Sequence, residues 1–79
     1  MKRKAIFDGI KAILEQQYEI EASKIMEKAV LLRDIGIGSL EFMNFILDVE
    51  KKFQFVYNFE IDIVTIDDLI NYIISKNST

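Results

Sequence analysis

Apolar residues recur at helical spacing in three stretches of the chain. The first runs from about Lys4 to Gln17, and its apolar positions are Ile6, Ile10, Ile13 and Leu14, with Phe7 beside them. This spacing places the side chains on one face of an amphipathic helix. Gly9 interrupts that helix at a cost of about 1 kcal/mol relative to alanine, and close packing at this point would account for it.

The second stretch, Leu40 to Phe53, has the clearest helical pattern and carries two apolar groups. At about 100° per residue, one side of the helix gathers Phe42, Phe45, Ile46, Val49 and Phe53. The nearly opposite side gathers Leu40, Met43 and Leu47. A helix packed on one core needs a single apolar face, so we expect the narrower stripe to bind a partner. Burial of the helix nearly all round is the alternative.

The third stretch begins at Thr65 and continues to about Lys76. Thr65 and Asp68 have the spacing of a capping box, in which each side chain bonds the backbone N–H of the other residue. The apolar positions that follow are Ile66, Leu69, Ile70, Ile73 and Ile74. We expect them to be the buried stripe of the last helix.

The two connecting segments show no helical period. Residues 18–38 are expected to form a long ordered loop, anchored by Ile20, Ile25, Ala29, Leu32 and Ile35. Residues 54–64 alternate like a strand, but nothing else in the chain resembles a strand that could pair with them. An extended segment with at most a short helical turn is favoured. The predicted fold is therefore all-α, a small four-helix bundle of three main helices plus a short third helix or turn.

Composition narrows the class of protein. The 79 residues form one domain, and 51% of them are apolar, which provides the single core that so short a chain needs. With no cysteine and no histidine, disulfides are excluded and a zinc site is disfavoured. The net charge of −3 without a dense basic patch disfavours nucleic-acid binding. No apolar run approaches the roughly 18 residues of a membrane span, so we expect a cytoplasmic protein. We also expect it to be a monomer.

One short motif suggests chemistry at a serine. It reads Asp34-Ile35-Gly36-Ile37-Gly38-Ser39-Leu40 and leads directly into the second helix. Ser39 alone could simply cap that helix. However, Gly36 and Gly38 leave its approach free of side chains, and a phosphodiester on Ser39 would meet the N–H groups and positive dipole end of the helix. The motif resembles the phosphopantetheine attachment site of acyl carrier proteins, typically Asp-Leu-Gly-x-Asp-Ser-Leu.

The resemblance to the acyl carrier protein family extends over nearly the whole chain. The first helix ends in Glu-Gln-Gln-Tyr, the second ends in Glu50-Lys51-Lys52-Phe53, and Thr65-Ile66 opens a closing helix. The resemblance implies a four-helix bundle whose Ser39 receives 4′-phosphopantetheine from coenzyme A through a separate phosphopantetheinyl transferase. It implies that Asp34, Gly36 and Gly38 belong to this cofactor site. Acyl, aminoacyl or peptidyl groups would then travel as thioesters between loading and processing enzymes, which would dock on Leu40, Glu41, Met43, Asn44 and Leu47.

The chain departs from the family pattern at several positions. Gly38 replaces the acidic residue that usually precedes the serine, Asn44 stands where an acidic residue is common, and Asp48 stands where small residues are common. Lys51 and Lys52 dilute the negative charge that typical partners recognise. The segment after Phe53 is about two residues short and lacks the usual Ile-Pro. These differences favour a specialised stand-alone carrier over a housekeeping fatty-acid carrier.

Two other functions remain open at this stage. The chain could be an interaction module that keeps the carrier fold without the arm, with Ser39 serving only as a cap. Within carriers, a D-alanyl or other aminoacyl cargo is as compatible with the residues as a fatty-acyl or polyketide cargo, because fold does not choose among them. An enzyme is disfavoured, since the chain has no histidine, no cysteine and no clustered acid pair.

Overall fold

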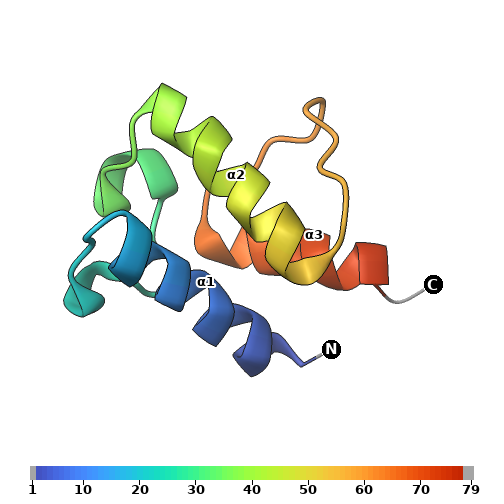
Figure 1. Cartoon of the computed structure of the whole chain (residues 1–79), viewed down its shortest axis with the longest axis horizontal. Coiled ribbons are helices and arrows are strands. Elements are labelled where there is room, and N and C mark those ends of the chain that lie inside the picture. Colours follow the sequence, from blue (N-terminus) through green and yellow to red (C-terminus); the bar gives the residue numbers. More distant parts are fainter. Residues whose placement is uncertain (1, 78–79) are drawn as a thin grey trace.

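The computed structural model describes residues 2–77, which form three α-helices and two short helical turns. The helices are α1 (Arg3–Gln17), α2 (Ser39–Phe53) and α3 (Ile66–Asn77). Between α1 and α2 lie η1, a 3₁₀ turn at Ala22–Lys24, and η2, a π-type turn at Leu31–Ile35 (Figure 1). The predicted all-α fold with three main helices is confirmed. None of the described helices is both long and apolar enough to cross a membrane.

The core forms where α1 packs against both α2 and α3. All four residues of the predicted α1 stripe are buried, and Phe7 is half-buried beside them. Gly9 is the point of closest approach, because a Cβ added there would lie 2.5 Å from Cζ of Phe53. The close packing that the sequence suggested at Gly9 is thus present, and it places the end of α2 directly on α1.

Residues 18–38 are packed on the core, but they are not a loop throughout. The pattern of apolar residues did not predict η1 and η2, because turns of three and five residues are too short to show a period. Ile25, Ala29 and Ile35 are buried as expected. Leu32 is 57% exposed, so its predicted role as an anchor is wrong.

Residues 54–64 form an extended segment with a turn and no helix. Asn58 builds the turn: its carbonyl accepts the N–H of Ile61 at 3.0 Å and its Oδ1 accepts that of Glu60 at 3.0 Å. Phe55 and Tyr57 are buried, whereas the apolar side chains after the turn are exposed or half-buried. The alternating apolar side chains are therefore buried in the core only before the turn, at Phe55 and Tyr57.

The two irregular segments meet and pair through their backbones. Val30 and Thr65 form an isolated antiparallel bridge. Around it, the N–H of Leu31 donates to the carbonyl of Val64 at 2.9 Å, and that of Ile66 to the carbonyl of Ala29 at 3.1 Å. The expectation that residues 54–64 find no strand-like partner is wrong at this one point, because residue 30 becomes extended only where the tertiary fold brings it to residue 65.

The predicted capping box at the start of α3 is confirmed. Oγ1 of Thr65 accepts the N–H of Asp68 at 3.0 Å, and Oδ2 of Asp68 accepts the N–H of Thr65 at 3.0 Å. The same carboxylate oxygen accepts the N–H of Val64 at 3.1 Å. Asp67 forms an ion pair with Arg3 of α1. The start of α3 is thereby joined to both the preceding segment and α1.

We expect Gly9→Ala to lower the free energy of unfolding in urea. Helix propensity alone would raise it by about 1 kcal/mol, but overpacking against Phe53 costs about 1–3 kcal/mol. In a Phe53→Leu background, where the side chain in contact is shorter, Gly9→Ala should lower the free energy of unfolding by less than it does in the parent chain. A stabilised Gly9→Ala variant would show that α1 and α2 are farther apart than described.

Candidate functional site

The chain reaches Ser39 through two glycines with different backbone roles. Gly36 ends η2 in the left-handed region, with φ +86°, a conformation that residues with a side chain rarely adopt. Ile37 is buried and anchors the connection to the core. Gly38 is extended and is the N-cap of α2, where its carbonyl accepts the N–H of Phe42 at 2.8 Å. The Gly38 N–H donates to Oε1 of Glu41 at 3.1 Å.

Ser39 is consequently the first residue of α2 rather than its cap. Its side chain is exposed, and within residues 2–77 its hydroxyl makes no hydrogen bond. The interpretation of Ser39 as the N-cap of this helix is wrong, because Gly38 occupies that position. The N–H groups of the first turn have no carbonyl partner within a helix, so they and the helix dipole favour an anion next to this hydroxyl.

A small apolar hollow lies beside the Ser39 side chain. Its volume is about 150 Å³, and Leu32, Phe42 and Ile63 line it together with Ser39. Leu32 comes from η2 and Ile63 from the segment that follows the turn at Asn58, so the hollow joins three parts of the chain. The sequence did not indicate Leu32 or Ile63 as site neighbours, because neither belongs to a stretch with helical period. Their positions follow from the backbone pairing of the two irregular segments.

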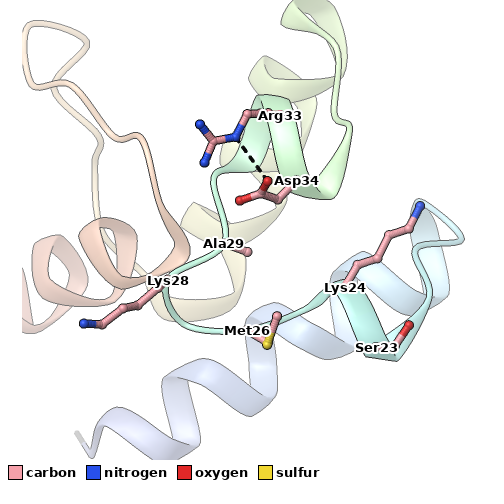
Figure 2. A pocket seen from close by; sticks show the side chains of 7 residues that line it. All are labelled: Ser23, Lys24, Met26, Lys28, Ala29, Arg33 and Asp34. Carbon is pink, nitrogen blue, oxygen red and sulfur yellow. Dashed lines mark hydrogen bonds and ion pairs between the residues drawn. The ribbon is translucent and has the colours of Figure 1, made fainter.

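Asp34 has a different environment from the one that the motif suggested. Oδ2 of its carboxylate accepts the N–H of Val30 at 2.9 Å, and Oδ1 accepts Nε–H of Arg33 at 3.2 Å. The hydrogen bond from the Val30 backbone, followed by that from Arg33, lowers the pKa of Asp34 below its usual range. Asp34 lines a second hollow rather than the one at Ser39 (Figure 2). Its contacts hold the turn that leads to Gly36.

The second apolar stripe of α2 lies on the surface. Leu40, Met43 and Leu47 are 84%, 43% and 48% exposed, whereas Phe45, Ile46 and Val49 on the other side are fully buried. The alternative in which α2 is buried nearly all round is therefore wrong. Glu41 and Asn44, the polar residues predicted to flank the stripe, are also exposed. The predicted docking residues thus form one accessible surface that begins next to Ser39.

Asp48, which departs from the family pattern, connects α2 to the end of α1. Its Oδ2 accepts the hydroxyl of Tyr18 at 3.0 Å. Burial, the hydrogen bond to Asp48 and the negative charge of that carboxylate raise the pKa of Tyr18 to about 12. The Tyr18 ring also packs edge-on against Phe45, with centroids 6.0 Å apart. A small residue at position 48 would lose this contact, so the departure has a structural reason.

Several known proteins of similar sequence are named acyl carrier protein. No protein-family model matches the chain. An acyl carrier protein of Thermotoga maritima is 30% identical over 76 residues, which cover 94% of each chain. An acyl carrier protein of Campylobacter jejuni is 30% identical over 71 residues, 87% of this chain and 92% of the relative. One from Helicobacter pylori is 31% identical over 75 residues, 87% and 91% of the two chains.

These relatives are named as carriers of acyl groups, which agrees with the prediction that this chain is not an enzyme. The aligned residues cover most of this chain and most of each relative, so the similarity is not confined to the motif at Ser39. The chain belongs to the acyl carrier protein family.

Proposed function

We propose that this chain carries acyl groups as thioesters on a 4′-phosphopantetheine arm attached to Ser39. The observation that carries the proposal is the free, exposed hydroxyl at the first position of α2. A residue with that exposure and no internal hydrogen bond is available to another protein without any rearrangement of the fold. The family membership of the chain supports the same role.

The residues around Ser39 fit the attached group. A phosphodiester on Oγ of Ser39 would lie at the N-terminus of a helix of 15 residues, where backbone N–H groups and the dipole stabilise negative charge. Gly36 and Gly38 present no side chains that would block the approach of a transferase. The apolar hollow formed by Leu32, Phe42 and Ile63 offers a contact for an apolar part of the arm or its cargo.

Attachment requires one bond exchange at phosphorus. Oγ of Ser39 forms a bond to the phosphorus that bears the pantetheine in coenzyme A, and the bond from that phosphorus to the 3′,5′-ADP leaving group breaks. The hydroxyl proton passes to a base of the transferase. The terminal thiol of the arm supplies the thioester chemistry, and partner enzymes supply the catalysis.

We expect Ser39→Ala to abolish attachment without affecting the fold. After incubation with coenzyme A and a promiscuous phosphopantetheinyl transferase, the intact mass of the parent chain should rise by one phosphopantetheine, located on the Ser39 peptide. The variant should gain nothing and keep its free energy of unfolding within about 0.5 kcal/mol, as is usual for exposed sites. Ser23→Ala, a change at another exposed serine, is the matched control and should still be modified. A folded parent chain that gains no mass would favour the unmodified interaction module.

We expect Gly38→Asp to raise kcat/KM for attachment by about three- to tenfold, because a charge at an interface rim mainly accelerates association. The backbone of Gly38, at φ −72° and ψ 168°, accommodates any residue, and an added Cβ would lie 3.5 Å from Oε1 of Glu41. Gly38→Asn is the control that adds a capping side chain without charge. Equal acceleration by both variants would attribute the effect to the helix cap rather than to the carboxylate.

We expect Met43→Glu or Leu47→Glu to lower kcat/KM for attachment by about tenfold, because a charge would replace an apolar contact near the centre of an interface. Both side chains are exposed, so circular dichroism and urea unfolding should be nearly unchanged. Val56→Glu introduces the same charge at an exposed apolar residue outside α2 and should have little effect. If Val56→Glu slows attachment as much, the stripe on α2 is not the surface that the transferase recognises.

A further inference from the structure

A second hollow lies between η1 and η2, in the segment that connects α1 to α2. Its volume is about 530 Å³, and it shares no residue with the hollow at Ser39. The residues that line it are Ser23, Lys24, Met26, Lys28, Ala29, Arg33 and Asp34 (Figure 2). Neither the attachment of an arm nor the exposed stripe of α2 accounts for this hollow.

The hollow is basic although the protein is acidic. Three cations and one carboxylate line it, in a chain whose net charge is −3. Within residues 2–77, Lys24 and Lys28 have neither an ion pair nor a side-chain hydrogen bond. Arg33 uses its Nε–H for Asp34, and the other end of its guanidinium group points away from that carboxylate (Figure 2). The donors at this rim are therefore available to an anionic partner.

The arrangement of these cations favours an extended partner over a small anion. In Figure 2, Lys28 and Arg33 point to one side of the hollow and Lys24 points to the other. The carboxylate of Asp34 lies between them, fixed by its hydrogen bonds to Val30 and Arg33. A small anion needs converging donors and would approach Asp34, whereas carboxylates spaced along a polypeptide would meet separated cations and leave Asp34 uncovered.

Apolar surface between the cations gives such a partner a second kind of contact. Met26 is 61% exposed, and Ala29 is a buried residue that contributes to the lining. A flexible thioether adapts to side chains of different shapes. A partner segment that carries acidic residues on either side of an apolar one would match both the charge and the apolar surface of the hollow.

We propose that this hollow, formed by residues 23–34, binds an acidic segment of a partner protein. Lys24, Lys28 and Arg33 pair with its carboxylates, and Met26 contacts an apolar side chain between them. The proposal goes beyond attachment at Ser39 and does not depend on it. A partner would recognise this chain through the charge of the hollow as well as through the apolar stripe of α2.

The test is a titration of the full, isotope-labelled chain with a short glutamate-rich peptide that carries one central leucine. We expect NMR shifts in the backbone amides of residues 23–34 and a dissociation constant that rises with salt. The double variant Lys24→Glu with Lys28→Glu should weaken binding by about three- to thirtyfold, the effect of losing two exposed ion pairs. Ser39→Ala should bind like the parent, which separates this proposal from the one for the arm.

The matched control is the double variant Lys2→Glu with Lys11→Glu, which changes the net charge equally outside the hollow. It should bind the glutamate-rich peptide nearly as well as the parent. The proposal is overturned if this control weakens binding as much, if a lysine-rich version of the peptide shifts the same amides, or if no binding occurs. Inorganic phosphate that saturates the same amides at lower concentration than the peptide would show a small-anion site instead.

Discussion

The backbone pairing between residues 29–31 and 64–66 fixes the geometry on which the rest of the site depends. The first stretch lies in the segment between α1 and α2, and the second joins the segment after α2 to the start of α3, so main-chain hydrogen bonds connect parts of the chain that are far apart in sequence. The pairing includes Leu31, where η2 begins. From η2 the chain continues through Gly36 to Ser39, the first residue of α2. It also brings Ile63 next to Leu32, so the hollow beside Ser39 is a product of this contact. The position of Ser39 thus depends on a few main-chain hydrogen bonds between two segments that are far apart in the sequence.

The acidic side chains of α2 hold the connecting segments in place. Glu41 accepts the N–H of Gly38 at its start, and Asp48 accepts the hydroxyl of Tyr18 at the end of α1. Glu50 accepts the N–H of Tyr57 at 2.7 Å, which secures the segment after α2. These hydrogen bonds fix the direction in which each carboxylate points. Carboxylates in fixed positions therefore lie along the same helix as the exposed apolar stripe.

The sequence predicted the parts of this structure that repeat with a helical period or follow a local rule. The stripe of α1, the two faces of α2 and the capping box of Thr65 and Asp68 all depend on residues close together in the chain, and all are present. The short turns η1 and η2, the exposure of Leu32 and the contact of residue 30 with residue 65 depend on residues far apart, which no local pattern encodes. At the site, the motif located Ser39 and its glycines correctly at the start of α2. It did not indicate that Asp34 would bond its own turn and line a different hollow.

The left-handed backbone conformation at Gly36 restricts which residues can occupy this position. Nothing lies within 4 Å of the place where the Cβ of an L-residue would be, so contact with neighbouring atoms does not require glycine at this position. Its positive φ disfavours every L-residue, but the mirror-image D-alanine prefers that same region of backbone conformation. A chemically synthesised chain with D-alanine at position 36 would have fewer unfolded conformations than the parent chain while keeping the backbone conformation that Gly36 adopts. The requirement at this position is therefore set by the handedness of the backbone and not by crowding around an L-configured Cβ.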